Sequence, residues 1–453
     1  MGDFISAQHL GAQRRRIALE PAQYLVAAYV ALILAGALLL SLPQASVGEP
    51  LPFVDALFMA ASATSVTGLS VVNVAHDLTR FGHVVLLLLM EVGALGIMTM
   101  STLLFLILGR RIRLRDRIVL QRDLNQGVFS GLVRLVRSVA LVAGGFQLAG
   151  ACALLAALPS EYTGGDAAFF ALFHSVSAFT NAGFDLFGDS LTRLSGHLLV
   201  TGTIAVLGIA GSLGFSVWTE IFAYPWTRSL SLFSRVVLRA SAALLAIGTL
   251  LYAALEWGNL ATFGTFEPGQ RFWHAFFLSA TTRSVGFTTV PVGALGETAL
   301  ILSIALMFIG GAPGSAAGGI KTTTFATVVA AVRAALRGHA EVNVLGRRLP
   351  PDAVAKAVAV LALFGGVLFA GVAGLTLTED AAFLPLLFEA TSALATAGLS
   401  TGITAQLTDP GKLILIVMMF AGRVGFLTLA LAWGTRPPGR ERFRLPEEGM
   451  PIG

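Results

Sequence analysis

Four short stretches of the chain share one pattern, and each is built around a glycine. A phenylalanine lies ten residues before the glycine, and a bulky apolar residue follows it directly. Small and hydroxylated residues occupy most of the positions just before the glycine. The stretches are Phe58–Leu69, Phe173–Phe184, Phe276–Phe287 and Phe388–Leu399, with glycines 103 to 115 residues apart. A unit of about a hundred residues that occurs four times predicts four equivalent elements around one axis.

Such loops could bind a cation through their backbone carbonyl groups. A ring of carbonyls replaces the water around an ion without adding a permanent charge, and glycine permits the unusual backbone dihedrals that this requires. Small neighbours let four loops approach closely. We therefore predict a filter for ions whose lining is Val66, Thr67, Gly68, Asn181, Ala182, Gly183, Ser284, Val285, Gly286, Thr396, Ala397 and Gly398. The alternative is that these glycines only allow helices to pack closely in a membrane.

A second unusual stretch, residues 310–324, is rich in glycine and lies within an apolar segment. Glycine and proline at this density must break a helix, which predicts a flexible segment below the filter. The broken part is Gly310, Gly311, Ala312, Pro313, Gly314, Ser315, Ala316, Ala317, Gly318 and Gly319, followed by Lys321. A phosphate-binding loop is not favoured, because Ile320 separates the last glycine from the lysine. A kinked helix is the simpler alternative.

Charged residues inside apolar segments need partners. Arg423 lies in the last apolar segment, where a cation demands a partner or a watery cavity; carbonyls of the broken helix are candidate partners, and snorkelling to an interface is the alternative. Lys321 is a similar case. For three acids we favour structural pairing over attraction of cations: Glu91, Glu220 and Glu389.

Acids expected on the side of the glycine loops are Glu161, Asp185 and Asp189, which either concentrate cations there or lie in solvated loops. The seven histidines show no ligand spacing, so we predict no structural metal. The single cysteine, Cys152, excludes an intrachain disulfide and is expected to be buried.

The elements that must position these residues are membrane helices. Hydrophobic residues make up 55% of the 453 residues and charged residues only 12%, and several apolar runs are long enough to cross a bilayer. Each repeat reads as a spanning helix, a half-length helix, the glycine loop and a second spanning helix. In the second repeat the last helix is predicted to be continuous over 197–222. Half-length helices that end at membrane depth must be packed in protein or line a watery path.

The predicted fold is thus an all-α polytopic membrane protein with one central pore. It would contain about eight spanning helices and four re-entrant pore helices, in repeats that cover 21–115, 116–228, 229–345 (with the broken stretch 310–324) and 346–435. Residues 1–20 and 436–453 flank them.

Basic residues predict the orientation. Of the 30 lysines and arginines, 23 fall in five clusters on the side opposite the glycine loops. The positive-inside rule places this side, and both termini, in the cytoplasm. A basic membrane-facing surface explains the net charge of +5 without nucleic acid as a partner.

The glycine stretches resemble those of the Trk/Ktr/HKT superfamily of potassium transporters. The resemblance covers about residues 20 to 435, and it is carried by the segments 66–69, 174–184 and 282–287. One spanning segment before the first loop makes the chain most similar to the Ktr membrane subunit (KtrB). In this superfamily a glycine in all four filters accompanies potassium preference, while serine in the first accompanies sodium permeability; Gly68 fits the potassium case.

The resemblance implies further properties. Potassium would be the substrate and would bind at the filter carbonyls, with no cofactor in this chain and no reaction catalysed. Residues 310–319, Lys321 and Arg423 would form an intramembrane gate on the cytoplasmic side of the filter. The resemblance also implies a multi-pass homodimer in the plasma membrane, in contact with lipids. A cytosolic ring of RCK-type subunits that bind ATP/ADP or NAD would regulate it. Sodium would be either coupled or activating.

Two other functions fit the sequence less well. An alternating-access secondary cation transporter also uses broken helices at the midplane, but it predicts inverted repeats, whereas these four share one orientation. An intramembrane hydrolase built on Ser315 would need a base, and no histidine is suitably placed for that role.

Overall fold

The structure, a computed structural model, describes residues 21–109, 127–158 and 164–425. This part of the chain is predominantly helical. Its only named strands form one short antiparallel hairpin of β1 (Asn343–Val344) and β2 (Arg347–Arg348). The helical class that the composition indicates is confirmed.

The helices differ widely in length along the chain. They are α1 (Pro21–Leu40), α2 (Phe53–Ser65), α3 (Val74–Asp77), α4 (Arg80–Gly109), α6 (Gly127–Ala157), α7 (Gly164–Phe179), α8 (Leu198–Leu213), α9 (Phe215–Thr227), α10 (Leu232–Glu256), α11 (Pro268–Thr281), α12 (Glu297–Phe308), α13 (Thr322–Leu336), α14 (Pro351–Thr378), α15 (Phe383–Leu394) and α16 (Asp409–Val424). Three 3₁₀ turns lie between them: η1 (Pro43–Ala45), η2 (Val292–Ala294) and η3 (Thr404–Gln406).

The four short helices α2, α7, α11 and α15 organise the packing. Each packs against the long helix before it, which is α1, α6, α10 or α14. Each also packs against a helix that follows the glycine loop of another unit: α4 contacts α7, α8 contacts α11, α12 contacts α15, and α16 contacts α2. The contact of α16 with α2 joins the end of the chain to its beginning, so these contacts form a closed cycle.

An ion pair fastens the point where the cycle closes. Lys412 in the first turn of α16 contacts the carboxylate of Asp55 in the first turn of α2 at 2.5 Å, and both side chains are largely buried. The pair therefore joins two segments that are far apart in the sequence.

Three helices of the described residues are long and apolar enough to cross a membrane: 136–157, 232–256 and 351–378. A fourth span is obtained if α8 and α9 count as one broken helix. Large apolar side chains such as Leu141, Leu148, Phe369 and Leu377 are exposed on the long helices. Exposed apolar surface of this kind is expected where helices face lipid. The predicted total of eight spans stays a prediction.

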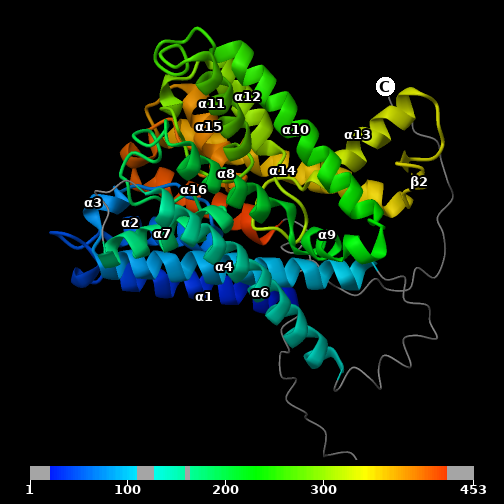
Figure 1. Cartoon of the computed structure of the whole chain (residues 1–453), viewed down its shortest axis with the longest axis horizontal. Helices are drawn as coiled ribbons and strands as arrows, with labels where there is room; N and C mark the ends of the chain where they lie inside the picture. The colour runs from blue at the N-terminus through cyan, green and yellow to red at the C-terminus, as the bar shows by residue number, and fades with distance from the viewer. Residues whose placement is uncertain (1–20, 110–126, 159–163, 426–453) are drawn as a thin grey trace, which may run out of the picture.

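Two local expectations were wrong. The helix expected over 197–222 is instead broken at Gly214, where α8 and α9 meet at 98°. Figure 1 shows α9 turned away from α8, toward the end of the molecule that carries α13 and β2. Cys152 is exposed rather than buried, because an apolar helix of a membrane protein can face lipid as well as protein.

Candidate functional site

The four glycine loops follow directly from the ends of the short helices, and their backbones share an unusual conformation. The residue two positions before each glycine has positive φ, at Val66 (56°), Asn181 (61°), Ser284 (75°) and Thr396 (47°). The glycines themselves have φ of 92°, 71°, 83° and 81° in chain order. Positive φ is rare and strained for a β-branched residue such as valine or threonine. Strain of this kind concentrates at functional sites, where the surrounding structure over-determines it.

The same helix-ending hydrogen bond recurs in three of the loops. The N–H of the residue before the glycine donates to a carbonyl five residues back, from Thr67 to Ser62, from Ala182 to Ser177 and from Ala397 to Ser392, each at 2.8 Å. These bonds satisfy carbonyls that a helix end leaves free. The third loop differs, since Val285 bonds to the carbonyl of Thr281 at 3.0 Å.

The four loops converge until their backbones touch. A Cβ on Gly68 would lie 2.2 Å from the carbonyl oxygen of Ala182, and a Cβ on Gly398 would lie 2.1 Å from that of Thr67. A Cβ on Gly183 or on Gly286 would lie 2.7 Å from the Cα of the other. Loop one therefore meets loops two and four, and loop two meets loop three.

The third loop also meets the fourth. A Cβ on Gly286 would lie 3.3 Å from the carbonyl oxygen of Ala397, and a Cβ on Gly398 would lie 3.3 Å from the Cα of Gly286. In loop three the carbonyl oxygen of Val285 would lie 3.1 Å from a Cβ on Gly183, so the residue before each of the four glycines places its carbonyl oxygen next to a neighbouring loop. All twelve residues predicted to line the filter lie in these four loops.

The position nine residues before each glycine holds a different side chain in each loop. In three of the loops this side chain accepts hydrogen bonds from residues that follow the glycine. Glu389 accepts from the hydroxyl of Ser400 (2.7 Å), from the N–H of Thr401 (2.9 Å) and from the hydroxyl of Thr404 (2.7 Å). His174 accepts from the N–H of Leu186 at 3.1 Å. The interpretation of Glu389 as a structurally paired acid therefore agrees with its contacts.

The equivalent positions in the other two loops hold apolar side chains. Met59 accepts a weak hydrogen bond from Ser70 through its sulfur at 3.3 Å. The third position is the buried Phe277.

The glycine-rich stretch runs as a mostly buried loop between α12 and α13. Its two ends pair with each other, through hydrogen bonds from Gly310 to Ile320 (3.0 Å) and from Ile320 to Phe308 (3.1 Å). A Cβ on Gly318 would lie 2.4 Å from the carbonyl oxygen of Ala395, directly before Thr396 of the fourth glycine loop. The loop is thus pressed against the converging glycine loops.

Two cations contact carbonyls of this loop. Arg423 is buried on α16 and donates to the carbonyl of Ala316, with a longer contact of 3.5 Å to the carbonyl of Gly93. Lys321 donates to the carbonyl of Ala317 at 2.7 Å. The expected pairing of Arg423 with carbonyls of the broken helix agrees with this geometry. The predicted gate residues therefore lie together.

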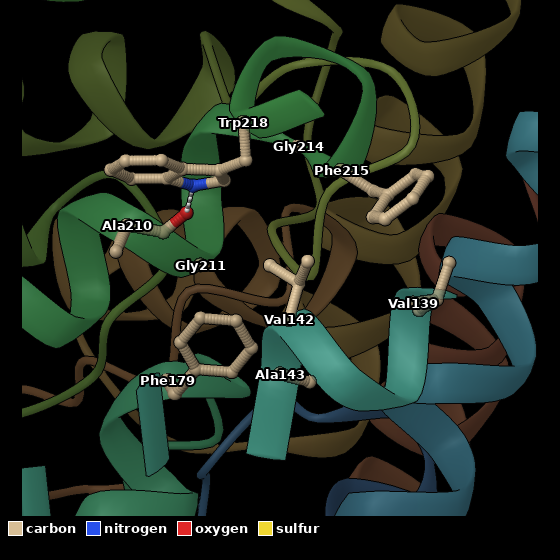
Figure 2. Close-up of a pocket in the computed structure, with 9 residues that line it drawn as sticks. All are labelled: Val139, Val142, Ala143, Phe179, Ala210, Gly211, Gly214, Phe215 and Trp218. Carbon is tan, nitrogen blue, oxygen red and sulfur yellow. Dashed lines mark hydrogen bonds between the residues drawn. The ribbon is translucent and has the colours of Figure 1, made fainter. Parts of the chain in front are cut away.

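Sequence reasoning missed the element that receives the loop, which is the break between α8 and α9. Ala312 donates to the carbonyl of Ser212 (2.9 Å), Ala316 to that of Gly211 (3.1 Å), and Phe215 to that of Gly314 (3.1 Å). Figure 2 shows how Trp218 lies over the break and donates its indole N–H to the carbonyl of Ala210, at 2.8 Å. The cavity beside Trp218 measures only about 10 Å³, the lower limit for one water, so it is a packing gap.

A signal for this element was present in the sequence. Each unit carries a Gly-x-x-Gly motif 24 to 28 residues after the glycine of its loop, and these motifs begin at Gly93, Gly211, Gly311 and Gly422. In three units a Cβ on the first glycine would lie within 2.0 Å of the carbonyl four residues before the filter glycine, in Thr64, Phe179 and Leu394. Only glycine lets the helix approach the loop this closely.

The other acids singled out in the sequence have local partners where the structure describes them, and so does Arg283. Glu91 accepts from Gln147 at 2.8 Å, and Glu220 accepts from the N–H of Ser231 at 2.9 Å. Asp189 pairs with Arg193 at 3.0 Å. Glu161 lies outside the described residues. Arg283, in the third glycine loop, is buried and donates to the hydroxyl of Ser241 on α10 at 2.9 Å.

A hollow of about 470 Å³ opens beside the converging loops. Gly68, Gly183 and Asp185 contribute to its lining. Asp185 accepts from the N–H groups of Phe187 (2.9 Å) and Gly188 (2.7 Å). Burial raises the pKa of Asp185, and these hydrogen bonds only partly offset that effect. Among the described residues no cluster of three or more His, Cys, Asp or Glu side chains could hold a metal.

Comparison with known proteins identifies the family. The family model of TrkH, described as a cation transport protein, matches residues 12–440. The chain is 37% identical to Ktr system potassium uptake protein B of Bacillus subtilis, over 93% of this chain and 95% of that protein. It is 39% identical to the Vibrio alginolyticus protein of the same name, over 96% and 95%.

Two further similarities agree with these. The chain is 36% identical to potassium/sodium uptake protein NtpJ of Enterococcus hirae, over 97% of this chain and 99% of that protein. The crystal structure of the potassium transporter TrkH from Vibrio parahaemolyticus matches the fold with a TM-score of 0.74 and 19% identity, covering 93% of this chain and 86% of that one. The resemblance drawn from the glycine stretches is confirmed: this chain belongs to the TrkH family of cation transport proteins.

Proposed function

We propose that this protein takes up potassium across the plasma membrane through one channel-like pore. The four glycine loops form its filter, and the segment 310–319 with Lys321 and Arg423 forms its gate. The observation that carries the proposal is the convergence of four backbones at Gly68, Gly183, Gly286 and Gly398, with carbonyl oxygens next to the neighbouring glycines. Relatives over nearly the whole chain are named as potassium uptake proteins.

The chemistry of such a filter follows from these carbonyls. A potassium ion that loses its hydration shell needs several oxygen ligands at once, and a ring of carbonyl dipoles supplies them without holding the ion too tightly to leave. Strained backbone at Val66 and Thr396 supports this role, because strain that the surrounding structure must hold in place is concentrated at functional sites.

Gating is supported by the position of the loop 309–321. It lies against the fourth filter segment at Gly318 and is held by Arg423 and by the broken helix α8–α9. A buried cation here also opposes entry of other cations. Flux then requires that the loop leave this position, which breaks the hydrogen bond from Arg423 to Ala316.

The wider assembly belongs to the same proposal. We infer both termini in the cytoplasm, a homodimer, and a cytosolic RCK-type ring that binds ATP/ADP or NAD and acts on the gate. The name Ktr system for two relatives supports a multi-component system, and the name of a third, potassium/sodium uptake protein, supports an involvement of sodium. An alternating-access transporter remains the second candidate.

The test is potassium uptake, with and without sodium, in cells that lack their own potassium uptake systems. Gly68→Ser places a side chain against the carbonyl of Ala182 and should lower the preference for potassium over sodium. Gly48→Ser is the matched control, because Gly48 also has positive φ (99°) but no neighbour within 4 Å. Deletion of residues 311–318 should give flux that no longer depends on regulation. Wild-type selectivity and flux in both variants, at equal expression, would refute the filter and the gate.

A further inference from the structure

A groove between α10 and α13 has apolar walls and a basic end. Its volume is about 730 Å³, and none of the filter or gate residues line it. Leu244 and Ile247 on α10 face Phe325 and Val329 on α13 across it. Alanines keep the groove open, namely Ala240, Ala243, Ala326 and Ala330. α10 is one of the helices that can span a membrane, so these walls lie at membrane depth.

The basic end is formed by arginines from both helices. Arg239 on α10 lies eight residues from Ile247, and Arg333 on α13 lies eight residues from Phe325. At 1.5 Å per residue each apolar wall is therefore about 12 Å long, most of the depth of one leaflet of a bilayer whose core is about 30 Å thick. Arg337 adds a third guanidinium at the same end.

These arginines have no acidic partner among the described residues. The one acid at this end of the groove, Glu341, is engaged at 2.8 Å by Arg348 of the hairpin. Arg239, Arg333 and Arg337 are all exposed. Three positive charges next to a hydrocarbon-lined groove call for a ligand with an anionic group and a long apolar part.

We propose that the groove binds an anionic phospholipid. The phosphate lies between Arg239, Arg333 and Arg337, and an acyl chain lies along the apolar walls. The guanidinium fork matches the geometry of phosphate oxygens, and basic pockets between membrane helices bind anionic head groups. Hydrocarbon is the material that fills an apolar groove at membrane depth, whereas an acidic peptide would match the arginines but not the walls.

The site also has a structural connection to the gate. α13 begins at Thr322, directly after the gate loop, and Phe325 in its first turn lines the groove and donates its N–H to the carbonyl of Lys321. A lipid in the groove therefore contacts the helix on which the gate loop is anchored. The experiment below measures lipid binding and not ion flux. Its result therefore does not depend on whether the proposed filter and gate are correct.

Lipid binding can be measured by native mass spectrometry of the purified full-length protein. Phosphatidylglycerol would be compared with phosphatidylcholine of the same acyl chains. Each arginine near an anionic surface contributes about fivefold in affinity, so Arg239→Gln/Arg333→Gln/Arg337→Gln should weaken phosphatidylglycerol binding at least about tenfold. The control is Arg228→Gln/Arg347→Gln/Lys356→Gln, which removes the same charge from the same basic side but does not line the groove. We expect it to bind like wild type.

A second pair of variants tests the acyl chain. Ala330→Trp, or the milder Ala243→Leu if the first fails to fold, fills the groove and keeps the arginines, and it should also weaken binding. Glycerol phosphate, which has the phosphate but no chain, should not displace the lipid at equal concentration. The proposal is overturned if the charge control loses as much binding as the groove variant, or if glycerol phosphate competes fully. It is also overturned if filling the groove leaves lipid binding intact and instead separates two copies of the chain.

Discussion

Two glycine substitutions near the fourth loop distinguish the effect of displacing a neighbouring carbonyl from the effect of backbone strain. We predict that Gly398→Ala lowers potassium affinity, while Gly402→Ala does not. Both glycines have strongly positive φ, of 81° and 102°. Their surroundings differ, because a Cβ on Gly398 would lie 2.1 Å from the carbonyl oxygen of Thr67, whereas one on Gly402 would meet nothing within 4 Å.

The expected magnitudes follow from this difference. Forcing alanine into a left-handed conformation costs roughly 1–2 kcal/mol of folding stability, and this cost applies to both variants. In Gly398→Ala the carbonyl of Thr67 must also retreat by about 0.9 Å to reach the shortest normal contact of 3.0 Å. An ion that loses one well-placed ligand should bind at least about tenfold more weakly, which is about 1.4 kcal/mol.

The assay is thermal unfolding of the purified protein over a range of potassium concentrations. Because an ion that binds only the folded state raises the Tm with the logarithm of its concentration, the curve for Gly398→Ala should shift to about tenfold higher potassium. The curve for Gly402→Ala should keep the wild-type midpoint at a slightly lower Tm. Equal potassium dependence in the two variants would refute the assignment of the Thr67 carbonyl to the ion site.

Three further predictions concern groups around the filter. Glu389→Gln should lower the unfolding free energy by about 1.5–3 kcal/mol, because charged hydrogen bonds to Ser400, Thr401 and Thr404 are weakened. An unchanged Tm would show that these hydrogen bonds do not stabilise the fourth loop. Because burial raises the folded-state pKa of Asp185, the folded state binds more protons than the unfolded state above an ordinary aspartate pKa of about 4. Stability should therefore fall as pH rises through that window, and Asp185→Asn should lack this slope when Tm is measured from pH 4 to 8. Arg423→Gln removes the charged hydrogen bond to the carbonyl of Ala316, which is worth about 1.5–3 kcal/mol. Potassium flux in liposomes should therefore rise about tenfold or more, with unchanged selectivity. Unchanged flux would argue that this hydrogen bond does not keep the proposed gate closed.

The glycine loops could be predicted because their spacing repeats four times. A single Gly68 would have said little, but four glycines with a phenylalanine ten residues before each predict equivalent backbones, and the structure brings these together. The break after α12 could be predicted for a similar reason, since no continuous helix tolerates the density of glycine and proline in residues 310–319. In both cases the backbone requirement is local, so it leaves a trace in the sequence.

The break at Gly214 could not be predicted with the same confidence. Glycine is common in membrane helices, and the turn at Gly214 is held by hydrogen bonds to a loop a hundred residues later in the chain. The partner of Arg283 was equally hidden, because Ser241 reaches it only through the packing of α10 against α11. The Gly-x-x-Gly motif that begins at Gly211 indicates a close approach to the glycine loop, but it does not indicate a break, because α4 continues through the same motif at Gly93.

One feature of the loops bears on how such a protein can change over evolutionary time. The position nine residues before each filter glycine holds methionine, histidine, phenylalanine and glutamate in turn, at Met59, His174, Phe277 and Glu389. A ring made by four identical subunits would alter all four quarters with each mutation. Here one mutation alters a single loop, so under the proposed function ion preference can change in small steps while the other three supports stay as they were.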